Sequence, residues 1–208
     1  MLFRSHRGVV ELLPHALPLL LPEVACDEDA VNRRNAAFAL GVMLEMAGPA
    51  AAGAYPAALG ALLPRLAPGV EEDPGTRDNA ASAVGRLLAS RGGPLPVRQA
   101  LEALLGALPL QEDMDETAAA YGGVLAVLER VGAGTEPEAL PLVPRALAAL
   151  GECASASAAT PAVLMRIGRV LGGLLAAHGP QLSPLLGQLP AEAREALRSL
   201  VAANGGAA

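Results

Sequence analysis

Apolar and small residues recur at intervals of three and four along almost the whole chain, which is the spacing of an amphipathic helix. No run shows the strict alternation of apolar and polar residues that marks a half-buried strand. Pairs such as Gly48-Pro49 and Pro68-Gly69 separate the helical stretches. The pattern predicts an all-α chain with helices at about residues 9–21, 29–46, 50–66, 73–90, 97–107, 113–131, 137–150, 160–178, 182–189 and 191–203.

The segment at residues 32–41 returns 44 residues later, at residues 76–85. The matching positions are Arg33 and Arg77, Asn35 and Asn79, Ala36 and Ala80, Ala37 and Ala81, Ala39 and Ala83, and Gly41 and Gly85. A period in the forties is typical of solenoids built from helical hairpins of the HEAT or armadillo kind.

We therefore expect an all-α HEAT-repeat α-solenoid, an armadillo-like superhelix of four to five helical hairpins. The hairpins are expected at about 9–47, 50–91, 95–131, 136–178 and 182–203, with a disordered tail at 204–208. The apolar first helix does not resemble a polar capping repeat, so we expect the chain to be a fragment, or a truncated product, of a longer solenoid.

Composition limits the classes of partner. Hydrophobic residues make up 52% of the chain and aromatic residues only 2%, so the core must consist of Leu, Ala and Val. The formal net charge is −6, which argues against nucleic acid as a partner and is compatible with basic proteins.

No pattern of catalytic or metal-ligating residues stands out. Cys26 and Cys153 are far apart and have no CxxC spacing, so they are expected to be reduced cysteines. Glu11 and His15 share a helical face, but a metal site needs further ligands. We predict no enzymatic activity, no cofactor and no metal.

The N-terminus superficially resembles a signal peptide, because Arg4 and Arg7 precede an apolar run at 12–21. Glu11 and His15 lie in or beside that run, and prolines recur within it, which argues against secretion. No run approaches the roughly 18 uninterrupted apolar residues of a membrane span, so we expect no membrane partner.

Two sets of polar residues recur with the repeat. The first is expected to form a structural ladder between consecutive second helices, through acid–base pairs at i,i+4 and through asparagine bonds to backbone. Its members are Asp29, Arg33, Asn35, Asp73, Arg77 and Asn79.

The second set is a strip of carboxylates at the turn inside each hairpin. Carboxylates favour helix N-termini through the backbone dipole. They could also form a negative surface that faces basic cargo, and the two interpretations are compatible. Its members are Asp27, Glu28, Glu71, Glu72, Glu112, Asp113, Asp115 and Glu116.

Several of these segments resemble the importin-β (karyopherin-β) nuclear transport receptors. The segment 33–42 is similar to a helix of that family, and 77–88 is similar to the helix that follows it. Residues 108–116 resemble the next repeat, and Leu189-Pro190 with the short helix after it resembles the C-terminal end. The family's lysine in the third segment is Gln111 here.

The resemblance implies the C-terminal HEAT repeats of a receptor that carries basic cargo, such as histones or ribosomal proteins, through the nuclear pore. It implies localisation in the cytoplasm and the nucleus, and nucleoporins as further candidate partners. The family binds the GTPase Ran mainly through N-terminal repeats, so Ran binding is expected only through repeats outside this chain. The alternative is a generic HEAT-repeat scaffold that mediates assembly without a transport role.

Overall fold

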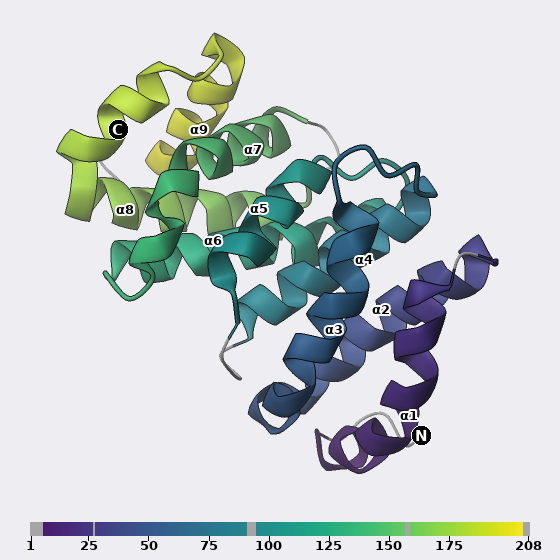
Figure 1. The fold of residues 1–208 in the computed structure, drawn as a ribbon. Helices are drawn as coiled ribbons and strands as arrows, with labels where there is room; N and C mark the ends of the chain where they lie inside the picture. The colour runs from purple at the N-terminus through teal and green to yellow at the C-terminus, as the bar shows by residue number, and fades with distance from the viewer. Residues whose placement is uncertain (1–5, 27, 91–94, 157–158, 206–208) are drawn as a thin grey trace.

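The structure is a computed structural model that describes residues 6–26, 28–90, 95–156 and 159–205. Within these ranges every regular element is a helix, so the all-α prediction is confirmed (Figure 1). The α-helices are α1 (His6–Ala25), α2 (Ala30–Ala47), α3 (Tyr55–Leu62), α4 (Pro74–Ala89), α5 (Val97–Ala107), α6 (Thr117–Gly132), α7 (Val143–Ser155), α8 (Pro161–Gly187) and α9 (Ala191–Ala203). The 3-10 segments are η2 (Gly48–Ala54), η3 (Leu63–Leu66), η4 (Met114–Glu116) and η5 (Pro137–Leu142).

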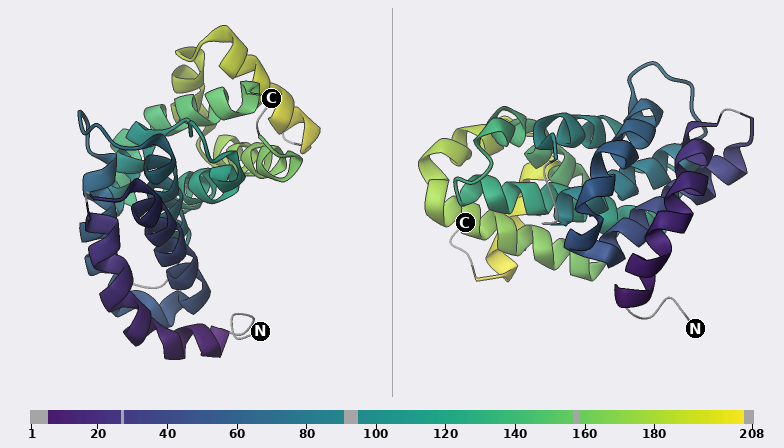
Figure 2. Two further views of the ribbon diagram at one scale, coloured as in Figure 1. Left: turned by 90° about the vertical axis from the view of Figure 1, so that its right-hand side faces the viewer. Right: turned by 60° about the horizontal axis from the view of Figure 1, so that its bottom comes forward.

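The helices form two layers. In one layer α2 packs along α4, α4 along α6, and α6 along α8. In the other, α1 contacts α3, and α5 contacts η3, η5 and α7. The final helix, α9, packs against α7 and α8. The chain therefore progresses from α1 at one end of an elongated body to α9 at the other (Figures 1 and 2).

Close packing in the α2–α4–α6 layer depends on small residues at equivalent positions of the repeat. A Cβ atom at Gly41 of α2 would overlap the backbone of Ala83 in α4. A Cβ atom at Gly85 of α4 would overlap the backbone of Ala119 and Ala120 in α6. Each glycine thus lets its helix approach the next one, which explains why the repeated segment ends on glycine at both places.

Prolines lie within α1 without ending it. Pro14, Pro18 and Pro22 all lie inside α1, which continues to Ala25 although a turn was predicted from residue 22. The three prolines are exposed and lie four residues apart, so the missing backbone hydrogen bonds fall on one solvent-facing side. The predicted helix 50–66 is instead η2, α3 and η3 in succession, with prolines near the start of each segment.

Helix α8 consists of two helical stretches that meet at a kink, close to the break predicted at residues 179–181. It has one non-helical residue, His178, at which the axis kinks. The His178 ring nitrogen Nε2 donates to the carbonyl oxygen of Gly132 at 2.9 Å, at the end of α6. The predicted tail at 204–208 falls partly on residues 206–208, outside the described ranges.

Three helical stretches are long and apolar enough to cross a membrane, judged by length and composition only: Arg7–Ala25, Ala30–Leu66 and Pro161–Gly187. This differs from the expectation based on uninterrupted apolar runs, because these helices continue through prolines and isolated charges. The second stretch comprises α2, η2, α3 and η3, and the third contains the His178 kink.

Candidate functional site

Among the described residues, most of the buried polar side chains lie at or near the N-terminal ends of α2, α4 and α6. Side chains join these ends and the turns before them to one another. Asp29 and Asp73 occupy the N-cap positions of α2 and α4. Asp29 accepts from the backbone N–H groups of Val31 and Asn32, at 2.8 and 3.1 Å. Asp73 accepts from the N–H and the hydroxyl of Thr76, at 2.8 and 2.9 Å.

The i,i+4 pairs expected in the ladder are therefore replaced by caps. Among the described residues no ion pair joins Asp29 to Arg33 or Asp73 to Arg77, because each aspartate is engaged by its own helix N-terminus. Arg77 instead donates to the carbonyl oxygen of Gly106 at 3.0 Å. Asn35 is exposed on α2.

Arg33 reaches the next hairpin. Its Nη2 lies 2.7 Å from Oε1 of Glu72, and its Nη1 donates to the carbonyl oxygen of Cys26 at 2.8 Å. Arg65 lies on the other side of the same carboxylate at 3.0 Å and also donates to the carbonyl of Ala25. The two arginines thus satisfy the carbonyls of Ala25 and Cys26 at the C-terminal end of α1, and the buried Glu72 holds both arginines in place.

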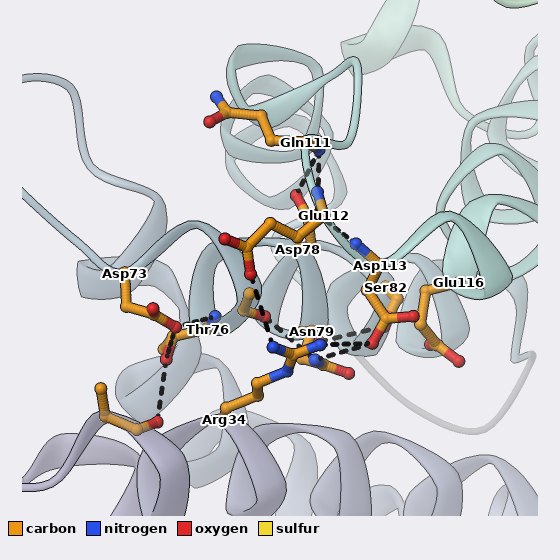
Figure 3. Close-up of polar contacts among 12 residues, drawn as sticks. Arg34, Asp73, Thr76, Asp78, Asn79, Ser82, Gln111, Glu112, Asp113 and Glu116 are labelled. Atoms are coloured by element: carbon orange, nitrogen blue, oxygen red, sulfur yellow. Dashed lines mark hydrogen bonds and ion pairs between the residues drawn. The ribbon is translucent and has the colours of Figure 1, made fainter. Parts of the chain in front are cut away.

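The loop between α5 and α6 is fixed by a single buried carboxylate. Asp78, in α4, is only 1% exposed. Its oxygens accept from the N–H groups of Gln111, Glu112 and Asp113 at 2.7 to 3.1 Å (Figure 3). Three converging donors stabilise a carboxylate in a buried site, and in return they hold three loop residues in one conformation.

The side chains of the same loop contact two more helices. Arg34 of α2 lies 3.4 Å from a carboxylate oxygen of Glu112 and 3.4 Å from one of Asp113. Asn79 of α4 donates from Nδ2 to the same Asp113 oxygen at 3.2 Å and to the carbonyl of Gly75 at 2.9 Å. Figure 3 shows Arg34 and Asn79 side by side below Asp113.

A third ionic link spans α2, α4 and η4, the segment that precedes α6. Arg86 of α4 binds both oxygens of Glu116, at 2.9 and 2.7 Å, and Glu45 at 3.0 Å. Its guanidinium lies 6.0 Å from the ring centroid of the half-exposed Phe38, within the range of a cation–π contact.

The carboxylates of the predicted strip therefore divide into two groups. Glu72 and Glu116 are buried in ion pairs, contrary to the expectation that they face solvent, because arginines from adjacent helices reach them first. Asp113 is half-buried and already bonded. The exposed members are Glu28, Glu71, Glu112 and Asp115. Asp27 lies outside the described residues.

Sequence reasoning missed Asp78, Arg34, Arg65 and Arg86 as contact residues. A signal existed for the first two, because they stand at the equivalent position of the repeated segment and have opposite charge. Arg34 on α2 and Asp78 on α4 contact the same loop. Arg34 binds the side chains of the loop, and Asp78 binds its backbone N–H groups. No comparable signal marks Arg65 and Arg86.

Two further titratable side chains meet in the core. Burial raises the pKa of the Cys153 thiol to about 11, and a hydrogen bond with Tyr121 opposes the rise. Burial is also the main cause of the raised pKa of Tyr121. Both cysteines are free, and the described residues contain no group of three or more His, Cys, Asp or Glu placed to hold a metal ion.

Comparison with known proteins gives matches of limited length. Importin-4 of Homo sapiens is 41% identical over 106 residues, which are 51% of this chain and 10% of that protein. Importin-4 of Mus musculus is 40% identical over 106 residues, with the same shares. The matched region thus spans about a tenth of these relatives. No protein-family model matches the chain. The two matches support the relationship to the importin-β family that the motifs indicate.

Proposed function

We propose, with the relationship to the importin-β family as the premise, that this chain is part of a HEAT-repeat nuclear import receptor. It binds basic protein cargo of the histone or ribosomal-protein type and shuttles between the cytoplasm and the nucleus. The observation that carries the proposal is the 41% identity to human importin-4 over half the chain. Ran and nucleoporins are partners of the receptor as a whole, and Ran binds through repeats outside this chain.

The carboxylates that remain exposed beside the hairpin turns support the cargo class. Glu28, Glu71, Glu112 and Asp115 come from three successive turns, and these turns are tied together by Arg33, Arg34 and Arg65. A fixed negative surface attracts basic segments and increases the rate at which they associate. We propose that these four carboxylates face the cargo.

Direct binding tests this function. Purified core histones and ribosomal proteins are titrated onto the immobilised chain, with an acidic protein of similar size as the control. A receptor fragment is expected to bind the basic proteins and to leave the acidic one in solution. If the chain does not bind the basic proteins and copurifies from extracts with one large stable complex, it is instead a HEAT-repeat scaffold.

A further inference from the structure

Arg34 forms the weakest of the ionic links between the turns. Both of its contacts, to Glu112 and Asp113, measure 3.4 Å, whereas Arg33 and Arg86 approach their carboxylates to 2.7 Å. The Arg34 side chain is 38% exposed, and Glu112 is 49% exposed. Exposed ion pairs of this kind contribute little to stability, because water screens them.

The loop that carries these two carboxylates does not depend on Arg34 for its conformation. Asp78 holds the backbone of Gln111, Glu112 and Asp113 from below, through bonds of 2.7 to 3.1 Å. The acceptors would therefore remain in place if the guanidinium of Arg34 moved away (Figure 3).

A buried acceptor beside Arg34 has no donor. Asn79 is 2% exposed, and its Nδ2 bonds Asp113, but its Oδ1 has no hydrogen-bond partner. A buried acceptor without a donor is unfavourable. In Figure 3 the Asn79 amide lies next to the Arg34 guanidinium, so departure of Arg34 would uncover this oxygen beside two carboxylates.

Arg34 is accommodated by the absence of a side chain on α4. A Cβ atom at Gly75 would overlap the guanidinium nitrogens and the central carbon of Arg34. The guanidinium therefore lies directly against the backbone of Gly75, and this space would become free if Arg34 turned outward.

From these contacts we propose that Arg34 occupies, from within the chain, a site that accepts an arginine or lysine side chain of a basic protein partner. The acceptors of the site are Glu112, Asp113 and Oδ1 of Asn79. The partner's cation displaces Arg34, which turns into solvent. This inference rests on the proposed function. It identifies Arg34 as a residue that lowers the affinity of the chain for basic cargo.

The test is the binding of a fluorescent arginine-rich peptide, with a citrulline version of the same peptide as the uncharged probe. Arg34→Gln removes the internal competitor and is expected to tighten binding by up to about fivefold, the range that an exposed ion pair supports. Arg98→Gln is the matched control, because it makes the same change of charge at an exposed arginine of α5. It is expected to have a clearly smaller effect.

Gly75→Ala provides a second variant that leaves the charge unchanged. Its methyl group fills the space against α4 that the cation occupies, so adding Gly75→Ala to Arg34→Gln should abolish the gain in binding that Arg34→Gln shows alone. Gly60→Ala is the control, since a Cβ atom there meets nothing within 4 Å. Thermal unfolding of all four variants identifies any change that comes from lost folding.

The outcomes separate this inference from the proposed function. If the original chain binds the arginine peptide, and Arg34→Gln binds it no more tightly than Arg98→Gln does, the displacement idea is wrong and the receptor function stands. If no form of the chain binds the peptide in preference to the citrulline version, both proposals fail. Tighter binding by Arg34→Gln supports the inference when adding Gly75→Ala abolishes it and adding Gly60→Ala does not.

Discussion

Arg34 and Asp78 occupy the same position in two copies of one repeated segment, yet they act on the α5–α6 loop in opposite ways. The aspartate is buried and binds backbone N–H groups, and the arginine is half-exposed and binds side-chain carboxylates. The change from arginine to aspartate at this position of the repeat thus gives Asp78 the role of holding the loop backbone. Arg34, which binds only side-chain carboxylates, can be displaced without loss of the loop conformation.

Asp78→Ala is expected to destabilise the chain by about 3 kcal/mol. The N–H groups of three loop residues would lose a charged acceptor, and α4 would lose its contact with the α5–α6 loop. Urea denaturation measures the difference. Asp115→Ala in the same segment is the control, since Asp115 is exposed, and its effect should stay within about 0.5 kcal/mol. Equal losses in the two variants would contradict the role given to Asp78.

Because of Cys153, the free energy of unfolding is expected to fall as the pH rises into the alkaline range. Its pKa is about 11 in the folded chain, against an ordinary value near 9. The unfolded chain therefore loses this proton first, and stability falls as pH rises from about 9 to 11. Between pH 8 and 10.5 the contribution is about 2 kcal/mol.

Urea denaturation at these two pH values should show a smaller loss for Cys153→Ala than for the original chain, with Cys26→Ala as the control. Tyr121, whose pKa is also raised, contributes in the same direction in all three proteins. A pH dependence that is equally steep in Cys153→Ala would show that the thiol is not responsible.

At the scale of the element, the spacing of α2, α4 and α6 depends on glycine. Gly85→Ala places a methyl group against the backbone of Ala119 and Ala120, and a helix backbone cannot move aside locally. We expect a loss of about 2 kcal/mol, as for other overpacked cores. Thermal or urea unfolding measures it.

Gly173→Ala on α8 is the control for this element, because a Cβ atom there meets nothing within 4 Å. Alanine favours a helix over glycine by up to about 1 kcal/mol, so this variant should be neutral or more stable. If both substitutions stabilised the chain, α4 and α6 would not be in close contact at Gly85.

At the scale of the whole molecule, the exposed carboxylates predict a salt-sensitive interaction. Charges at the surface are screened over about 8 Å at physiological ionic strength. Binding of a basic peptide should therefore weaken as salt is raised from about 0.05 to 0.3 M. Neutralising Glu28, Glu71, Glu112 and Asp115 to their amides should weaken it by roughly tenfold at low salt.

The control for this prediction removes the same number of charges elsewhere. Glu138, Glu152, Glu192 and Glu195 are exposed in the C-terminal half of the chain, away from the first three turns. Their replacement by glutamine tests the effect of net charge alone. Equal loss of binding in the two variants would mean that the peptide does not bind preferentially at the turns and that the net charge of the chain determines its affinity.

The sequence by itself determined the helical class and the limits of α5 and α9. These depend on local periodicity and on glycine and proline, which act within a few residues. The sequence also singled out Asp29 and Asp73 as structural residues, but paired them with Arg33 and Arg77. Both aspartates cap their own helices instead. The two roles place an acidic residue at the same position of a helix, so the sequence pattern does not distinguish them.

Only the tertiary structure decided which carboxylates are buried. Glu71 and Glu72 are neighbours in the chain, yet the first is exposed and the second is held between Arg33 and Arg65. That difference depends on how far α2 and η3 lie from the turn, and so on the helix spacing set by small residues such as Gly41. A long arginine side chain can reach any of several neighbouring carboxylates, and the packed arrangement of the helices selects one of them.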